Sequence, residues 1–336
     1  MGHRSIKRIF HRSLEELRAT REIAHVTTRR KAITTLVAKF NIQLMNRNGF
    51  KEPPKVRKRL NRKHEIMLEY FEKRFGDFYK NYDYSRPLEG ASPDRRGRIW
   101  ICWWQGEENA PLIVKRCIQS IRDGAGDRTV TLITEENFRD YVDIPDWLYE
   151  KYQAGLITRT NLSDLLRLSL LARYGGMWID ATFFCTEKGV LDTYFQYPIW
   201  SIKRPDYLHC SVASGFFAGY SLMCSYENRY VFAVIRDFFL EYWAQSDKLI
   251  DYLLVDYMIV MAQKYDSRIK AVFDSIVPNN PNCDELFKSV GCEFSDEVWE
   301  TLRRDTYLFK LSWKHSFPET VKGNETFYAK LLKGIL

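Results

Sequence analysis

The sequence of 336 residues lacks an uninterrupted apolar run of about eighteen residues, the length that a helix needs to span a membrane. The nearest candidate, residues 252–262, is shorter and contains Asp256, so it predicts a helix of the protein core. The N-terminal residues MGHRSIKRIF also lack the continuous apolar segment of a secretory signal. These absences lead us to expect a cytoplasmic protein without a membrane span.

Cysteine is sparse and shows no regular spacing. The seven cysteines are odd in number and form no CxxC pair, which argues against a structural zinc site and favours a reducing compartment. The sequence also lacks GxGxxG and GxxxxGK[ST], the glycine-rich loops that bind phosphate groups in dinucleotide dehydrogenases and P-loop enzymes. Both enzyme classes are therefore poor candidates.

Positive charge is concentrated at one end of the chain. Residues 1–64 hold 18 Lys/Arg and 4 Asp/Glu, a balance of +14, so the remainder carries −6 of the total of +8. Apolar residues in this segment follow helical spacing from Ile6 to Leu17 and from Ile33 to Leu44. Such helices can lie on an anionic membrane surface, bind nucleic acid, or pack on a neighbour with a solvated basic face. We favour the first and third alternatives and expect no nucleic acid partner.

Composition divides the chain into three parts. Residues 1–80 are predicted to be a basic helical segment, a platform for a membrane or a partner, and 81–97 a turn-rich linker. In the main domain, residues 98–336, strands and helices alternate, which predicts an α/β fold with a parallel, nucleotide-binding sheet. The predicted strands are 98–104, 129–134, 197–203, 214–220 and 307–313, and the predicted helices are 111–123, 146–152, 231–242 and 252–265.

The most informative stretch is NLSDLLRLSLLARYGGMWIDAT, residues 161–182. Its leucines occupy most sides of a helix, so the helix should be buried, with Asn161 or Ser163 as the N-cap and Gly175-Gly176 as the stop. The apolar run MWI then predicts a central strand. Asp180 falls where this strand ends, and open α/β sheets bind their ligands at the carboxyl ends of strands.

Two charged residues precede Asp180 on the predicted helix. Asp164 and Arg167 are three residues apart, so they share one helix face. Buried charges need partners, and two interpretations remain open. Asp164 and Arg167 could form a purely structural ion pair while Asp180 caps a turn, or the three residues could form a ligand-binding site. The second is chemically reasonable because a carboxylate accepts hydrogen bonds from hydroxyls and a guanidinium donates several.

The order SDxxR followed by LLxxYGGxWxDAT resembles the capsular polysaccharide synthesis proteins of the glycosyltransferase family 32 group. The resemblance extends upstream to residues 99–106 and downstream to Tyr242-Trp243 and Asp251-Tyr252, and it covers roughly residues 98–315, about two-thirds of the chain. It implies a GT-A fold with a Rossmann-like sheet, a nucleotide-sugar donor, and transfer with retention of anomeric configuration.

The resemblance also implies a divalent cation, magnesium or manganese. Related enzymes place an Asp-X-Asp motif here, whereas this chain has Asp180-Ala181-Thr182, which we interpret as weakened or rearranged metal binding. Residues 312–315, SWKH, resemble a C-terminal loop near the metal and diphosphate. The implied metal ligands are Asp180, Thr182 and His315, although His315 could equally be an exposed loop residue.

Further roles follow from the same resemblance. Asp180, Asp164 and Arg167 are the implied catalytic residues, and Trp103 and Trp104 at the end of the first predicted strand would stack on the base, unless they are core aromatics. Asp256 stands among apolar residues, so it either has a partner or has a raised pKa, and it could line the acceptor site. The implied donor- and nucleotide-binding residues are Trp103, Trp104, Gln105, Asp164, Arg167, Ser312 and Trp313.

The resulting hypothesis is a retaining glycosyltransferase of capsular or other surface polysaccharide synthesis. It would move a hexose or N-acetylhexosamine from a nucleotide sugar, with UDP as the expected carrier, to a lipid-linked or growing glycan at the inner face of the plasma membrane. The departing phosphate would take the acceptor proton, so no protein base is required. The alternative is a non-catalytic, sugar-nucleotide-binding scaffold of an assembly complex, which only Thr182 supports.

Overall fold

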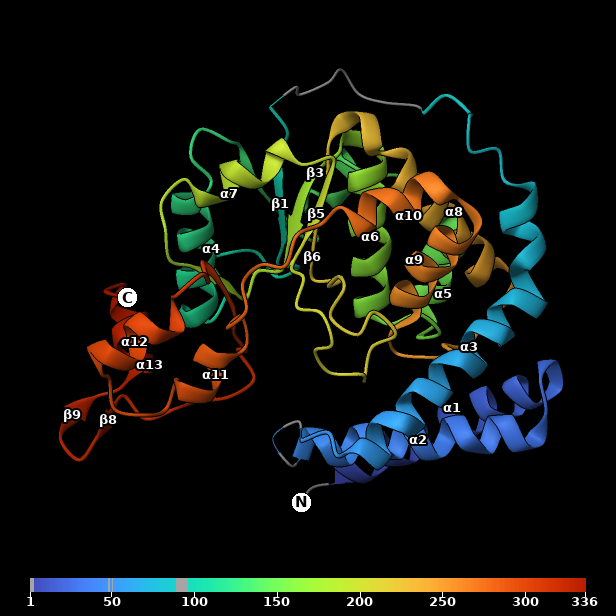
Figure 1. Ribbon diagram of the computed structural model, residues 1–336, viewed down its shortest axis with the longest axis horizontal. Coiled ribbons are helices and arrows are strands. Elements are labelled where there is room, and N and C mark those ends of the chain that lie inside the picture. The colour runs from blue at the N-terminus through green and yellow to red at the C-terminus, as the bar shows by residue number, and fades with distance from the viewer. Residues whose placement is uncertain (1–2, 48, 50, 89–95) are drawn as a thin grey trace.

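The computed structural model describes residues 3–47, 49, 51–88 and 96–336, and within these ranges the side chains from residue 14 onward (Figure 1). The strands are β1 (Ile99–Cys102), β2 (Val130–Ile133), β3 (Gly176–Ile179), β4 (Phe183–Cys185), β5 (Ile199–Ser201), β6 (Ser221–Cys224), β7 (Leu308–Lys310), β8 (Thr320–Val321) and β9 (Asn324–Glu325). The longer helices are α1 (His3–Val26), α2 (Arg29–Arg47), α3 (Pro54–Asn81), α4 (Leu112–Gly124), α6 (Arg159–Tyr174), α8 (Tyr230–Gln245) and α9 (Leu254–Tyr265). The shorter helices are α5 (Asp146–Gln153), α7 (Val190–Thr193), α10 (Ser267–Asp274), α11 (Glu285–Ser289), α12 (Asp296–Leu302) and α13 (Phe327–Lys333), with 3-10 turns η1 (Phe138–Asp140), η2 (Tyr194–Gln196) and η3 (Tyr226–Asn228).

A mixed five-stranded sheet lies at the centre of the described chain, in the order β2-β1-β3-β6-β5. β1 pairs in parallel with β2 and β3, whereas β6 is antiparallel to both β3 and β5. The α/β class is therefore confirmed, but the prediction of a parallel sheet is wrong for β6. Because only β6 runs in the opposite direction, the carboxyl ends of β1, β2, β3 and β5 lie at the same end of the sheet as the amino end of β6. We call this end of the strands the shared edge of the sheet.

The predicted strand at residues 214–220 is also wrong. Ser214 and Gly215 have φ angles of 46° and 82°, in the left-handed region, which an extended strand does not use. A Cβ on Gly215 would lie 1.9 Å from the carbonyl oxygen of Arg204, so the close approach of two loop segments requires glycine. The chain then turns tightly through a bridge between Ala218 and Ser221 before β6 begins.

Helices cover both faces of the sheet (Figure 1). In β3, Met177 and Ile179 belong to the apolar cluster that includes α4 and α7, while Trp178 belongs to the cluster that includes α6, α8 and α9. This alternation follows from strand geometry, in which successive side chains point to opposite faces. The sheet therefore separates two cores, and both must be filled by apolar residues of the helices.

Local sequence signals explain both ends of α6. The N-cap is Thr158, whose hydroxyl accepts from the Asn161 backbone N–H while the Asn161 side chain returns to Thr158, a reciprocal capping box. The prediction that Asn161 or Ser163 is the N-cap was therefore about one turn late, because Asn161 is already the third helical residue. The predicted stop is confirmed: Gly175 has a φ of 68° and Gly176 of 89°. A Cβ on Gly176 would lie 2.3 Å from the Arg98 carbonyl oxygen, so β1 and β3 approach as closely as they do only with glycine here.

The N-terminal helices form a layer beside the α/β core, and α3 runs from this layer up along α8 and α9 (Figure 1). Phe71, Phe75 and Tyr79 of α3 are buried in the same apolar cluster as Phe238 of α8. The division at residues 80 and 97 stays a prediction, and part of the predicted linker, residues 89–95, lies outside the described residues. The side chains of the predicted amphipathic run from Ile6 lie outside them as far as residue 13.

No helix among the described residues is long and apolar enough to cross a membrane. All seven cysteines are free, and four of them are buried.

A buried ion pair joins α3 to the start of α9. The Lys63 ammonium lies 2.7 Å from Asp251 Oδ2, and the side chains are only 1% and 4% exposed. Burial opposes ionisation of Asp251, but Lys63 and Lys39 together hold its pKa at about 2. The two charges therefore depend on each other, since either one alone would be buried without compensation.

We predict that Lys63→Met lowers the free energy of unfolding by about 3–5 kcal/mol, because it leaves the Asp251 carboxylate buried and unpaired. Urea denaturation measures this loss. The matched control is Lys31→Met, which breaks the partly exposed pair with Glu69 and should cost less than about 1 kcal/mol. The double variant Lys63→Met/Asp251→Leu should recover much of the loss; equal costs for the two single variants would contradict the prediction.

Candidate active site

The site lies at the shared edge of the sheet. Trp103 follows β1, Asp180 follows β3, and Gly219 precedes β6, so the topology brings these positions together from distant parts of the sequence. The Asp180 backbone N–H donates to the Tyr220 carbonyl at 3.1 Å, which closes the edge between β3 and β6. Ligands of α/β sheets bind at such an edge, where strand ends leave a crevice.

Arg167 connects three parts of the site. Its guanidinium pairs with Asp164 on the same face of α6 and donates to the Gly219 carbonyl oxygen. It also lies over the ring of Trp178, 5.5 Å from its centroid. Asp164 and Arg167 therefore share one face of α6, as their spacing predicts, and the ion pair of the structural interpretation is present.

Asp180 is the second carboxylate of the edge. Its Oδ1 accepts from the Trp178 indole N–H at 3.1 Å, and its Oδ2 lies 3.0 Å from the Lys310 ammonium. Burial opposes ionisation of Asp180, but Lys310 and Arg167 outweigh burial and hold its pKa below the usual value. Burial raises the pKa of Asp164, and Arg167 opposes that rise without cancelling it. The site thus holds two carboxylates with opposite pKa shifts around one guanidinium, a pattern common at functional sites.

Lys310 is the site residue that the sequence did not reveal. β7 pairs with β4 in antiparallel register, with Lys310 opposite Phe183, and this pairing brings the lysine to Asp180. Its ammonium lies 2.6 Å from Thr182 Oγ1 as well as 3.0 Å from Asp180 Oδ2. The strand-like alternation of residues 307–313 was a usable signal for β7, but its partner strand is more than a hundred residues away in sequence.

Asp256, on α9, belongs to the same cluster. Its Oδ2 accepts from the Ser211 hydroxyl at 2.6 Å, and a Cβ added at Gly219 would lie 3.1 Å from its Oδ1. Burial raises the pKa of Asp256 to about 6; Ser211 and Arg167 oppose the rise, whereas Asp164 adds to it. The expectation that this acid either has a partner or has a raised pKa is met on both counts.

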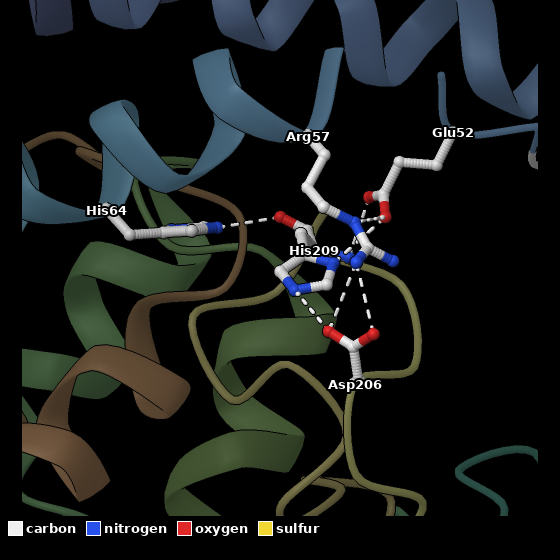
Figure 2. Close-up of polar contacts among 5 residues, drawn as sticks. All are labelled: Glu52, Arg57, His64, Asp206 and His209. Carbon is white, nitrogen blue, oxygen red and sulfur yellow. Dashed lines mark hydrogen bonds and ion pairs between the residues drawn. The ribbon is translucent and has the colours of Figure 1, made fainter. Parts of the chain in front are cut away.

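Figure 2 shows how the β5–β6 loop, residues 202–220, is attached to the turn between α2 and α3. His209 lies between two carboxylates, with its Nδ1 2.9 Å from Glu52 and its Nε2 3.2 Å from Asp206. Its backbone N–H also donates to Glu52 at 2.7 Å, and Arg57 reaches Asp206 at 3.0 Å. These contacts fix one end of a loop whose other end carries Gly219, the partner of Arg167.

His64 of α3 extends this attachment into the core (Figure 2). Its Nε2 lies 2.8 Å from the His209 carbonyl oxygen and its Nδ1 lies 2.7 Å from the Tyr257 hydroxyl of α9. A carbonyl only accepts, so Nε2 must carry the proton and Nδ1 accepts from Tyr257. Burial lowers the pKa of His64 to about 4, with help from Lys63, and the ring is neutral at pH 7.

The predicted base-stacking residues separate into two groups. Trp103 and Trp313 meet in a T-shaped contact with ring centroids 5.7 Å apart, and Trp313 is 46% exposed, so both rings lie near solvent. Trp104 is only 8% exposed and donates its indole N–H to Ser163 in the core, which favours the core interpretation for this residue. Gln105 is exposed in a turn closed by the Gly106 N–H and the Trp103 carbonyl. The stacking roles themselves stay predictions.

The predicted metal ligands do not form one cluster. Asp180 and Thr182 both contact Lys310, whereas the exposed His315 packs against the rings of Phe287 and Phe317. Ser312 lies beside it on the same loop and accepts from the Lys314 backbone N–H. Within the described ranges, no three His, Cys, Asp or Glu side chains lie together so as to hold a metal ion. The residues present therefore do not fit a protein-bound divalent cation, and the metal stays a prediction.

The fold and the shared edge define an α/β protein with charged and aromatic side chains at a candidate ligand site. The family model of the capsular polysaccharide synthesis proteins matches residues 47–331, so the chain belongs to this family. A stretch of 95 residues is 35% identical to the O-glycosyltransferase braB of Annulohypoxylon truncatum, covering 26% of this chain and 23% of that protein. The match thus spans less than a quarter of the relative's length. No solved structure matches the chain.

We predict a pH-dependent effect of Asp256→Asn on stability. The folded-state pKa of about 6 exceeds the ordinary value of 3.8, so the stabilisation from holding this proton is complete below about pH 4 and is lost as the pH rises through about 6. Relative to wild type, Asp256→Asn should therefore gain about 3 kcal/mol between pH 4 and pH 7. Urea denaturation across this pH range measures the difference.

Ser211→Ala serves as the companion variant for this test. Removing the hydroxyl removes a hydrogen bond that favours the Asp256 carboxylate, so the loss of stability should be larger and should continue to a higher pH. A difference between Asp256→Asn and wild type that does not change with pH would contradict the assignment.

Proposed function

We propose that the chain is a retaining glycosyltransferase of GT-A type that acts in capsular or surface polysaccharide synthesis. The observation that carries the proposal is the convergence of Asp164, Arg167 and Asp180 at the ligand-binding edge of the sheet, in a chain that belongs to this family. Similarity to a protein described as an O-glycosyltransferase supports the same reaction class. The donor would be a nucleotide sugar, with UDP as the expected carrier and a hexose or N-acetylhexosamine as the transferred group.

The geometry supports a division of roles within the site. Asp164 would accept hydrogen bonds from donor-sugar hydroxyls and Arg167 would donate to them, since both side chains face the edge. Trp103 and Trp313 would hold the base, because their rings lie together near solvent. Asp256 lies next to Gly219 on the same side as the Arg167 guanidinium and would line the acceptor site.

The first test is a thermal-shift and hydrolysis screen of UDP-, GDP- and dTDP-sugars, with and without manganese. We predict that one of them stabilises the protein and is slowly cleaved, and that Asp164→Asn lowers turnover about a hundredfold or more while retaining the fold. Asn is used because Ala would leave Arg167 buried without its partner. Asp180→Ala should abolish transfer.

The matched control is Asp143→Asn, an exposed carboxylate outside the site, which should turn over like wild type. If folded Asp164→Asn and Asp180→Ala turn over substrate at nearly the wild-type rate, the assignment of these residues to the active site is wrong. Failure of every sugar nucleotide to bind well-folded protein would favour the scaffold alternative.

The N-terminal helices offer a surface for an anionic membrane, where a lipid-linked acceptor would be found. Ile33, Val37, Phe40 and Leu44 are all exposed and follow the spacing of one face of α2. Exposed basic side chains adjoin this face along α2 and the start of α3, so the surface combines apolar area with positive charge. A groove of about 560 Å³ next to Leu44 continues the apolar surface to Pro53 and Val56. We refer to these exposed α2 residues as the α2 apolar face.

We predict that Phe40→Glu weakens binding to vesicles containing phosphatidylglycerol by about tenfold or more, because it places a carboxylate on the α2 apolar face. Vesicle sedimentation measures binding. Val298→Glu, an exposed apolar position on α12 far along the chain, is the matched control and should bind like wild type. Equal binding by wild type and Phe40→Glu would assign the α2 apolar face to another role.

A further inference from the structure

An ammonium ion of the chain itself lies between the two oxygens that the Asp-X-Asp comparison assigned to a metal. Lys310 Nζ lies 3.0 Å from Asp180 Oδ2 and 2.6 Å from Thr182 Oγ1. The aromatic rings of Phe183 and Tyr220 lie 5.3 and 5.6 Å from the same nitrogen. Two polar oxygens and two π-faces thus surround one positive charge.

Several backbone contacts hold Lys310 at this position. The Lys310 N–H donates to the Cys283 carbonyl at 2.8 Å, and the next N–H, that of Leu311, donates to the Thr182 carbonyl at 2.9 Å. β7 therefore binds directly to the segment that follows Asp180. The side chain is 22% exposed, so the ammonium is held by the fold but still reaches the edge where a ligand would lie.

A divalent cation fits this position poorly. Hard cations prefer several carboxylate or carbonyl oxygens, whereas here one carboxylate is already shared between Trp178 and Lys310 and the other oxygen is a neutral hydroxyl. A cation placed between these oxygens would meet the Lys310 ammonium at close range, and like charges repel strongly at a partly buried site. The Lys310 side chain would have to leave first.

We propose that the Lys310 ammonium takes the place of the divalent cation and binds the diphosphate of the nucleotide donor. This role rests on the proposed function, because Lys310 would neutralise the negative charge of the diphosphate that leaves from the same site. An ammonium has three N–H donors, and Asp180 and Thr182 accept two of them in the described contacts, so one can point to a phosphate oxygen. Lysine is a common phosphate-binding residue, acting as a point charge.

The reaction step balances without a further reactant. The bond between the sugar C1 and the diphosphate oxygen breaks, and its electron pair stays on that oxygen, where Lys310 donates a hydrogen bond. The acceptor hydroxyl oxygen forms the new bond to C1 on the same face, and its proton passes to the departing phosphate. Lys310 keeps its own proton throughout and stabilises the charge that develops on the leaving group.

The test is calorimetric titration of UDP and GDP into the full chain in EDTA and then in manganese. We expect wild type to bind one of them in EDTA, and Lys310→Met to bind it at least about tenfold more weakly, with no recovery in manganese. Lys188→Met, an exposed lysine in the turn after β4 and outside the site, is the matched control and should bind like wild type.

The outcomes separate this inference from the proposed function. Binding by wild type in manganese but not in EDTA would overturn the role of Lys310 and leave the transferase proposal in place, and this result needs no variant to fold. Equal binding by wild type and Lys310→Met in EDTA would also overturn it. Failure of wild type to bind either nucleotide under both conditions would remove the proposed function and this inference with it.

Discussion

The Arg167 guanidinium is the group on which the candidate site depends. One buried side chain pairs with Asp164 on its own helix, donates to the Gly219 carbonyl before β6 and covers the Trp178 ring of β3. A buried guanidinium is costly unless its charge is paired, so these contacts fix the relative positions of α6, the sheet and the β5–β6 loop. The same charge lowers the pKa of Asp180 and restrains the rise in Asp164 and Asp256.

The part of the site that could be predicted from sequence is local. The leucine-rich helix, its glycine stop and the strand before Asp180 all lie within one continuous stretch, so periodicity and end signals were sufficient to predict the shared helix face of Asp164 and Arg167 and the position of Asp180 at a strand end. The family resemblance joined the three residues into one site. The direction of β6 and the position of Lys310 depend on pairing between distant strands, which periodicity does not specify. Residues 214–220 show the same limit, since their apolar character resembled a strand while Ser214 and Gly215 required a turn.

The charged residues of the N-terminal segment show a second limit of prediction from sequence. Lys63 belongs to the densest basic run of the sequence, where a solvated side chain is the ordinary expectation. It is nonetheless almost fully buried, because Asp251 lies opposite it, and its neighbour His64 is buried against His209 and Tyr257. The polar contacts that attach α3 to the β5–β6 loop and to the region of α9 depend on partners about 150 to 200 residues away, which local sequence patterns do not specify.

Thr182 and Lys310 are best understood together. An Asp-X-Asp motif with a divalent cation sums to zero charge, since two carboxylates balance the metal. Asp180, Thr182 and Lys310 also sum to zero, with one carboxylate and one ammonium. A change from aspartate to threonine alone would leave part of a metal's positive charge without a carboxylate to balance it. A lysine added alone would compete with the metal for the same carboxylates. The two changes together keep the net charge of the site at zero. If Lys310 binds the diphosphate as proposed, the departure from the Asp-X-Asp motif does not by itself imply a loss of function, because β7 would supply the positive charge that the diphosphate requires.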